Sequence, residues 1–265
     1  MRFLIAVDLE GIACSYGVVG GSIEDSFNIT FVRKQASLEA DAAARALFDC
    51  GAEEVVVWDC HGRGCSLDYM AIDRRAKLAI GAGGDTRFPV IDGYTGVLFI
   101  GYHAMAGTPK AAMAHTFNSK KFQRVWVNGV PVGEIAIDAM IAGEHGVPVI
   151  FVSSDDKGVA EAEAALPWAE TCTTKQSLAM TRVISKHPAA VVEEIYEAVK
   201  RAVGRLSDMQ LYRVRLPLEL TLRYCRADEC QASKIYDSQG QLFSFTDAFT
   251  RQGDLNTCEE IIPRL

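Results

Sequence analysis

The sequence predicts an α/β fold: a mostly parallel sheet flanked by helices in the N-terminal part, with a smaller mixed α+β C-terminal part. Three observations support this prediction. Short continuous apolar runs, typical of strands buried on both faces, recur through the first 155 residues. Segments with helical spacing separate them, and strand, helix and strand in succession predict right-handed crossovers. After residue 212 the pattern changes to alternating polar and apolar residues.

The first strand-helix-strand unit begins at the N-terminus. The run FLIAV at 3–7 predicts a buried strand, and a glycine-rich loop follows it. Ala and Leu at helical spacing predict a helix over 31–51, and the terminal Gly51 is a C-cap signal. The apolar run within 53–62 predicts the second strand, which ends in Asp-Cys-His-Gly.

The next elements continue this alternation. Residues 96–109 contain a third apolar strand that ends at a histidine. The pair Asn128-Gly129 predicts a tight hairpin. A helix is expected over 133–146, and a buried strand follows at 147–156.

Helices and then strands are expected in the C-terminal part. Residues 156–206 are predicted to be mostly helical, with 189–206 as the clearest amphipathic helix. The alternating segment 212–224 predicts an antiparallel strand, and a mixed α+β tail follows. We therefore divide the chain into an α/β core at 1–155 and a helical and mixed α+β second part at 156–265 that can be continuous with it.

The composition argues against several classes of protein. Hydrophobic residues make up 49% and charged residues 23% of the chain, as in globular proteins, and no apolar run reaches the ~20 residues of a membrane span. The net charge of −7 and the scattered Lys and Arg argue against a nucleic-acid partner. Eight cysteines without Cys-x-x-Cys pairs indicate reduced thiols. We expect a cytoplasmic protein with no membrane partner.

Motifs of several common sites are missing from the sequence. No Gly-x-Gly-x-x-Gly opens a predicted helix, and the glycine cluster at 81–85 predicts a loop. The sequence also lacks the Gly-x-Ser-x-Gly elbow of esterases and the His-Glu-x-x-His helix of zincins. Nucleotide-binding, esterase and zincin functions are therefore not predicted.

Polar side chains follow three predicted strands. Asp8 and Glu10 follow the first strand, Asp59 and His61 the second, and His103 the third. Parallel sheets bind ligands at the carboxyl ends of their strands. Carboxylates and imidazoles are zinc ligands, and a carboxylate can bridge two metal ions. The set predicts a hydrolytic metal site with one histidine and two carboxylates for each metal.

Each of these residues also has an ordinary structural explanation. An aspartate at a strand end commonly forms a turn or caps a helix, and partly buried histidines are common without a ligand. Glu134 opens a predicted helix, where the helix dipole favours a carboxylate. His115 lies in a longer segment, where packing alone could explain it. The repetition of donors at successive strand ends favours the metal site.

The ordered motifs resemble the zinc-dependent D-aminopeptidase family. The resemblance covers about the first 155 residues, and it consists of Asp8-Leu9-Glu10-Gly11, Asp59-Cys60-His61, Gly101-Tyr102-His103-Ala104, Met113-Ala114-His115-Thr116 and Asn128-Gly129 followed by Gly133-Glu134.

The resemblance implies a site for two zinc ions in each subunit. Asp8 would bridge both ions. Glu10 and His61 would complete one zinc site, and His103 and Glu134 the other.

The resemblance also implies the reaction, the substrate and the assembly. His115 would act beside the metals as nucleophile or general base, and N-terminal D-residues would be released from short peptides or amides. The subunits would form a homo-oligomer, with a decamer of two stacked pentameric rings as the expected form. Cys60 departs from the family pattern, in which a hydroxyl residue is more usual, so its thiolate could bind zinc or merely pack.

Two other kinds of function fit the same residues. Two-metal sites also serve other amidases and phosphohydrolases. A non-catalytic module would bind a metal or ligand without turnover. We expect metal-assisted amide hydrolysis, and substrate comparison and metal content distinguish these alternatives.

Overall fold

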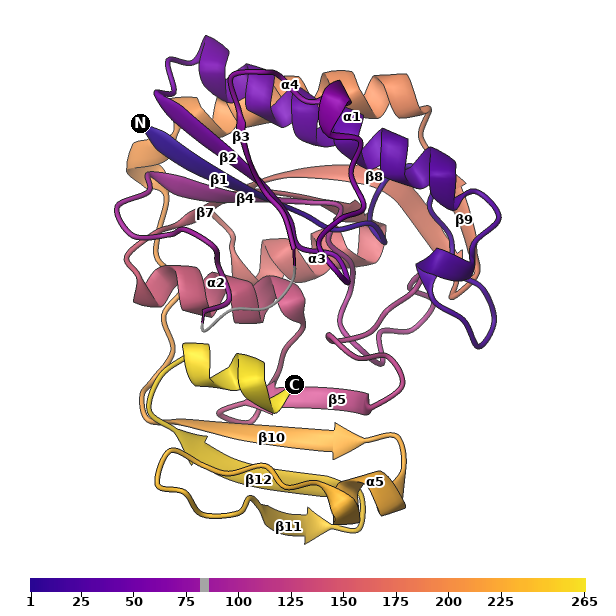
Figure 1. The fold of residues 1–265 in the computed structure, drawn as a ribbon, viewed down its shortest axis with the longest axis vertical. Coiled ribbons are helices and arrows are strands. Elements are labelled where there is room, and N and C mark those ends of the chain that lie inside the picture. Colours follow the sequence, from indigo (N-terminus) through magenta and orange to yellow (C-terminus); the bar gives the residue numbers. More distant parts are fainter. Residues whose placement is uncertain (82–85) are drawn as a thin grey trace.

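Two β-sheets, joined by a buried helix, form the architecture of the chain (Figure 1). The computed structural model describes residues 1–81 and 86–265. The predicted loop at 81–85 therefore lies, apart from its first residue, outside the described residues. None of the helices in the described ranges combines the length and the hydrophobicity that a bilayer crossing needs.

The larger sheet has seven strands in the order β3-β2-β1-β4-β7-β8-β9. All neighbouring strands are parallel except β8 and β9, which confirms the predicted mostly parallel sheet. Its strands are β1 (Arg2–Val7), β2 (Glu54–Asp59), β3 (Lys77–Ala79), β4 (Gly96–Ile100), β7 (Val149–Asp155), β8 (Glu170–Ala179) and β9 (Arg182–Ser185).

Helices cover both faces of this sheet (Figure 1). Alternate side chains of β1 point to opposite faces, so Phe3 packs in the cluster that contains α1 and α4, whereas Leu4 packs in the cluster that contains α2. Buried alanines, among them Ala36, Ala40 and Ala43, let α1 approach the sheet closely. The helices are α1 (Ile29–Asp49), α2 (Glu134–Glu144), α3 (Asp156–Ala165), α4 (Pro188–Gly204) and α5 (Ala227–Ala232).

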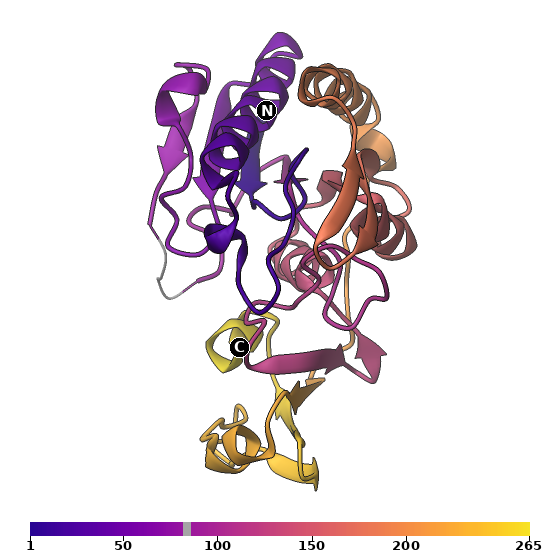
Figure 2. The ribbon, with the colours of Figure 1, turned by 90° about the vertical axis from the view of Figure 1, so that its right-hand side faces the viewer.

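The smaller sheet is antiparallel, with the order β11-β12-β10-β5-β6. It lies beyond α2, away from the larger sheet (Figure 2). The predicted hairpin is confirmed: Asn128 and Gly129 have φ angles of 51° and 78°, the left-handed conformation that a two-residue hairpin turn requires. Its strands are β5 (Phe122–Val127), β6 (Val130–Pro131), β10 (Leu218–Tyr224), β11 (Ser244–Asp247) and β12 (Thr250–Leu255).

Short 3₁₀ turns complete the described structure. The C-terminal turn packs beside α2 (Figure 1). These turns are η1 (Ile23–Asp25), η2 (Tyr69–Ala71), η3 (Leu206–Asp208) and η4 (Glu259–Arg264).

The structure corrects the mostly helical prediction for residues 156–206. Helices α3 and α4 lie there, but the β8–β9 hairpin separates them. The sequence of β8, ETCTTKQSLA, has little apolar periodicity, because buried polar residues such as Thr174 and Lys175 occupy it. The three threonines of β8 could have indicated a strand, because β-branched residues are enriched in strands. The larger sheet thus continues past residue 155, because β8 and β9 belong to it. The division of the chain into parts 1–155 and 156–265 stays a prediction.

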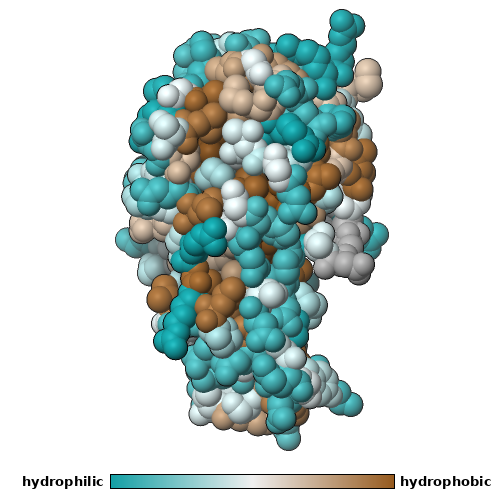
Figure 3. Space-filling model, turned by 90° about the vertical axis from the view of Figure 1, so that its left-hand side faces the viewer, coloured by the Kyte–Doolittle hydropathy of each residue, from teal (hydrophilic) through white to brown (hydrophobic). Residues whose placement is uncertain are grey.

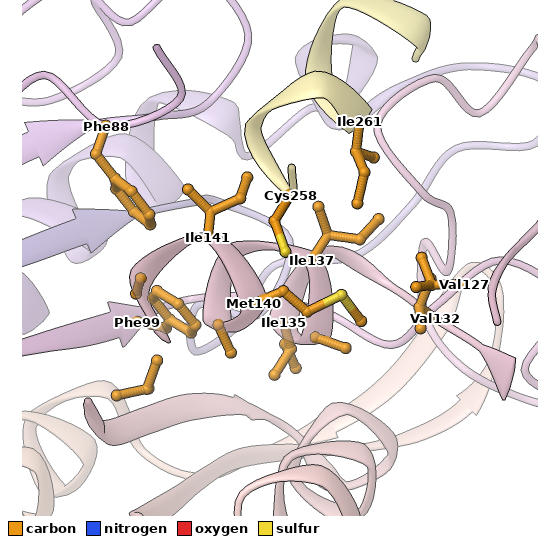
Figure 4. Close-up of a cluster of buried hydrophobic side chains, with 14 of the residues drawn as sticks. Phe88, Phe99, Val127, Val132, Ile135, Ile137, Met140, Ile141, Cys258 and Ile261 are labelled. Atoms are coloured by element: carbon orange, nitrogen blue, oxygen red, sulfur yellow. The ribbon is translucent and has the colours of Figure 1, made fainter. Parts of the chain in front are cut away.

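Helix α2 connects the cores of the two sheets. Its residues from Glu134 to Gly143 are all buried. Figure 4 shows Ile137, Met140 and Ile141 of this helix among side chains of β4 and of the C-terminal turn, including Phe99 and Ile261. A helix that is buried on all sides lies in the protein interior. The packing around α2 therefore fixes its position relative to both sheets.

Packing around α2 makes a first prediction. Replacing the fully buried Ile137 with Ala leaves a cavity, and it should lower the free energy of unfolding by about 2 to 5 kcal/mol. The matched control is Ile184→Ala on β9, where the side chain is 60% exposed and the change should stay within about 0.5 kcal/mol. Denaturant titration of both variants measures this difference; equal losses would contradict the packing assignment.

Candidate metal centre

The structure brings the six predicted site residues together at one edge of the larger sheet. They lie just after β1, β2 and β4, in the first turn of α2, and in the segment between β4 and β5. A cavity of about 420 Å³ opens there, and we call it the central cavity. Five of the six residues line it: Asp8, Glu10, His61, His115 and Glu134.

His103 lies directly behind His115. Its side chain is 1% exposed, and the two imidazole rings stack with centroids 4.1 Å apart and an interplanar angle of 12°. The His103 Nε2 lies 3.5 Å from Asp8 Oδ2 and 3.3 Å from Glu134 Oε1. His103 therefore lies between the carboxylate that follows β1 and the carboxylate that opens α2.

The other histidines face the same carboxylates. His61 Nε2 lies 3.5 Å from Glu10 Oε1, and His115 Nε2 lies 3.7 Å from Glu134 Oε1. Two groups of three have ligand atoms within 4.8 Å of one another: Asp8 with Glu10 and His103, and His103 with His115 and Glu134. The second group includes His115, for which the family resemblance implies a catalytic role, so geometry alone makes His115 a further candidate ligand.

Backbone carbonyls orient two of the imidazoles. The Nδ1 of His103 lies 3.0 Å from the carbonyl oxygen of Ala104, and the Nδ1 of His115 lies 2.8 Å from that of Met113. A carbonyl only accepts, so in both rings Nδ1 carries the hydrogen. The Nε2 of each ring then faces the carboxylates, and it is the nitrogen that would bind a metal or accept a proton when the ring is neutral.

Two buried atoms of the site fit a metal ion. Among the described residues, Glu10 Oε2 and His103 Nε2 belong to the few buried side-chain atoms without a hydrogen-bond partner. Buried polar atoms are normally hydrogen-bonded, and each exception needs an explanation. Zinc binds both carboxylate oxygen and imidazole nitrogen, so the residues present suit this ion.

The electrostatics of the site also suit a cation. Burial, reinforced by the Glu10 charge, raises the pKa of Asp8 well above its usual value. Burial has the same tendency at Glu134, but the charge of His103 outweighs it and lowers the pKa of Glu134 to about 2. At His61, Glu10 overcomes the effect of burial and raises the imidazole pKa to about 9. Protons thus compensate the buried carboxylates, and a metal ion can replace them.

A close contact between two turns positions the residues after β1 and β4. Gly11 N donates a hydrogen bond of 2.7 Å to the carbonyl of Gly101, whose φ of +71° favours glycine. A Cβ added to Gly11 would lie 1.9 Å from the carbonyl oxygen of Tyr102. Glycine is required here because the two backbones touch, and this contact places Glu10 near His103.

Strand β8 holds the turn after β1 from the other side. The buried ammonium of Lys175 donates to the carbonyls of Glu10 (2.5 Å) and Ile12 (2.8 Å). Glu39 of α1 accepts a hydrogen bond of 3.1 Å from Ala13 N. Burial lowers the pKa of Lys175 to about 8 and raises the pKa of Glu39 to about 7. The strand missed by the sequence analysis thus helps to hold a predicted ligand.

The segment that carries His115 has a strained backbone. Met113 and Phe117, two residues on either side, have φ angles of 53° and 57°, which bulky residues rarely adopt. Hydrogen bonds hold this conformation: Met113 N donates to the carbonyl of Met180 (3.2 Å), and Phe117 N donates to Glu134 Oε1 (2.7 Å). Strain of this kind is concentrated at functional sites.

Two expectations about the segment after β2 can now be judged. The carboxylate of Asp59 accepts hydrogen bonds from the backbone N–H groups of Ser66 and Leu67, so it fixes a loop in the way an ordinary turn-forming aspartate does. The Cys60 thiol donates to the carbonyl of Val7 at 3.1 Å, and burial raises its pKa well above the usual value. These contacts favour packing for Cys60. All eight cysteines are free thiols.

Several residues of the central cavity were not found from the sequence. Glu24 Oε1 lies 3.7 Å from His61 Nδ1. Arg87 forms a pair of hydrogen bonds with Asp138 of α2, at 2.7 and 2.8 Å. These residues lie in loops without a motif, and only the tertiary fold brings them to the site. The cavity-lining residues that the sequence analysis did not identify are Ser22, Glu24, Gly62, Arg87, Phe117, Asn118, Ser119 and Lys120.

Comparison with known proteins agrees with this geometry. A family model described as D-aminopeptidase matches residues 1–253. The chain belongs to the D-aminopeptidase family. A D-aminopeptidase of Bacillus subtilis (strain 168) is 32% identical over 198 residues, which cover 71% of this chain and 69% of the relative.

The fold of this D-aminopeptidase family member also matches a solved structure. The Zn-dependent D-aminopeptidase DppA from Bacillus subtilis, described as a self-compartmentalizing protease, aligns with a TM-score of 0.91 and 25% sequence identity. The alignment covers 100% of this chain and 95% of that chain. The chain is therefore an aminopeptidase, a hydrolase of peptide bonds, with the α/β fold of that enzyme.

The buried Glu39 makes a prediction about pH. Its pKa in the folded protein, about 7, exceeds the ordinary glutamate value of 4.5, so ionising it costs stability as the pH rises through this interval. Glu39→Gln removes this cost. The free energy of unfolding of the variant minus that of wild type should therefore be about 2 kcal/mol larger at pH 8 than at pH 5, because only wild type loses stability over this interval.

Denaturant titrations at the two pH values measure this change. The exposed Glu193 of α4, replaced by Gln, provides the reference for a carboxylate in water. A relative stability of Glu39→Gln that does not change with pH would refute the assigned environment of Glu39.

Proposed function

We propose that this aminopeptidase is a zinc-dependent D-aminopeptidase with a dinuclear site, which releases N-terminal D-residues from short peptides or amides. The observation that carries the proposal is the convergence of three histidines and three carboxylates on one buried edge, where Glu10 Oε2 and His103 Nε2 have no hydrogen-bond partner among the described residues. Membership of the D-aminopeptidase family and the likeness to a Zn-dependent enzyme support the metal and the substrate class.

The ligand roles that the family resemblance implies are compatible with the positions of the side chains. Asp8 would bridge the two ions, because it lies beside both Glu10 and His103. Glu10 and His61 would complete one zinc site, and His103 and Glu134 the other, which agrees with the two contacts of 3.5 and 3.3 Å. When bound, zinc supplies Lewis-acid polarisation of the scissile carbonyl.

His115 is suited to proton transfer. Its Nδ1 hydrogen is fixed on the Met113 carbonyl, so Nε2 is the nitrogen that can exchange a proton in the cavity. As general base, Nε2 takes the proton of the attacking water and later returns it to the leaving amine. Glu134, 3.7 Å away, stabilises the imidazolium between these steps. Direct nucleophilic attack by Nε2 uses the same lone pair.

His115 provides a test of catalysis that is separate from metal binding. His115→Ala should retain nearly the wild-type zinc content and lower kcat on a D-aminoacyl amide by about 100-fold to 10,000-fold, as loss of an acid-base group does. Asp8→Ala should lose both metal and activity, since a bridging carboxylate serves two ions. Metal analysis and steady-state kinetics on the same preparations compare the two variants.

Three results would argue against parts of this proposal. Loss of zinc from His115→Ala would make His115 a ligand, and two tightly held ions in Asp8→Ala would contradict the bridge. Hydrolysis of phosphoesters in preference to D- and L-aminoacyl amides would favour a phosphohydrolase. Bound zinc without turnover of any of these substrates would favour a binding module.

The proposed assembly is a cytoplasmic homo-oligomer, with two stacked pentameric rings as its form. The structural relative is described as self-compartmentalizing. Several large apolar side chains are exposed and available for contact between subunits, and apolar groups interrupt the hydrophilic surface in Figure 3. Among the exposed large apolar residues are Val19, Phe27, Met70 and Val130.

Light scattering tests this assembly. At micromolar concentration the zinc-loaded protein should have a mass well above that of a dimer of 28.9 kDa subunits. Replacing the fully exposed Phe27 with Asp should shift the mass toward smaller species if that side chain lies in a contact. A fully active monomer would refute the assembly.

A further inference from the structure

Within the proposed function, we propose that Lys120 binds the C-terminal carboxylate of the peptide, so that the site selects short peptides with a free carboxylate over peptide amides. The inference depends on the proposed D-aminopeptidase activity. It identifies a substrate-binding residue outside the metal ligands and His115.

The first argument is the position of Lys120 among three cavities. A second cavity of about 270 Å³ adjoins the central cavity, with Glu10, Ser22, His115, Ser119 and Lys120 in both. A third, of about 650 Å³, is lined by residues of the segment 118–121 and of the C-terminal part. Among the residues that the structure describes, Lys120 is the one that lines all three. It therefore lies at the border between the third cavity and the two cavities that contain His115.

The second argument is charge. The chain carries a net charge of −7, but the third cavity is lined by four cationic residues and one carboxylate. A locally positive cavity attracts an anionic group toward it. Its charged residues are Lys120, Lys121, Lys234, Arg264 and Glu229.

The third argument is that Lys121 and Arg264 already have partners, whereas among the described residues Lys120 and Lys234 have none, and of these two only Lys120 lines the cavities that contain His115. Lys121 Nζ donates to the carbonyl of Leu265 at 3.0 Å, and Arg264 Nη1 donates to the carbonyl of Glu260 at 2.7 Å. Within residues 1–81 and 86–265, no carboxylate lies within ion-pair distance of the exposed Lys120 ammonium. The cavity carboxylates contact histidines instead, as at Glu10 and Glu134. The Lys120 ammonium is thus available to a carboxylate from outside the chain.

The length of a short peptide fits this position. In a dipeptide, the carboxylate is only one residue, about 3.8 Å along the chain, beyond the scissile amide. If that amide lies at His115, the two cavities that both His115 and Lys120 line have room for the peptide carboxylate. The flexible four-carbon side chain of lysine can follow a carboxylate over several ångströms. An amide at the same place has no charge for Lys120 to bind.

The experiment compares D-alanylglycine with D-alanylglycinamide as substrates of the zinc-loaded enzyme. Lys120→Met should lower kcat/KM on the free acid by about 10-fold to 100-fold, the range of a lost charge-assisted hydrogen bond. Most of this loss should appear in KM. On the amide, kcat/KM should change less than about twofold, and Lys120→Arg should keep most of the preference for the acid because it keeps the charge.

The matched control is Lys234→Met. Lys234 lines the third cavity but neither of the cavities that contain His115, so its loss should leave both substrates nearly unchanged. Equal losses on acid and amide in Lys120→Met, or no loss on the acid, would overturn the inference. An equal loss on the acid in Lys234→Met would overturn it as well, because a long-range field would then explain the preference. A wild-type enzyme that hydrolyses neither peptide would overturn the proposed function, and this inference with it.

Discussion

The contact between the turn after β1 and the turn after β4 is the constraint on which the rest of the site depends. The backbones touch at Gly11 and Tyr102, leaving no room for a Cβ at Gly11. Since β1 and β4 are neighbours in a parallel sheet, both turns leave the same edge. Their contact converts two separate sequence motifs into one cluster in which Asp8 lies 3.5 Å from His103.

Folding this cluster without a bound cation is energetically unfavourable. Three carboxylates and two of the histidines are largely removed from water, and burying such charges is unfavourable unless they are compensated. The surrounding structure compensates through fixed hydrogen bonds, including those of Lys175 and of the strained segment around His115. Rigid support of this kind holds the ligand atoms in place before a metal binds. In functional sites, the surrounding structure commonly compensates for the unfavourable energy of buried charges and strained backbone in this way.

The sequence was informative where one physical pattern dominates. Continuous apolar runs predicted the parallel strands, and polar residues at their ends predicted the edge at which the site lies. Strand β8 was missed because its buried residues, such as Lys175, are polar and make their contacts with a distant turn. Asp59 also follows the strand-end pattern, but one oxygen of its carboxylate accepts hydrogen bonds from backbone N–H groups, as in an ordinary turn. Glu24 and Lys120 have no motif, since only tertiary folding brings their loops to the cavity.

Helix α2 has one end in the metal centre and its sides in the cores of both sheets. The helix therefore couples the smaller sheet to the metal centre. A displacement of that sheet would also move Glu134, as long as the apolar contacts around Ile137 and Met140 are kept. Substitutions in the outer strand β11, which is exposed, leave the packing of α2 unchanged. Substitutions of buried residues of β10, which belong to the same apolar cluster as α2, affect the position of Glu134 at the start of the helix.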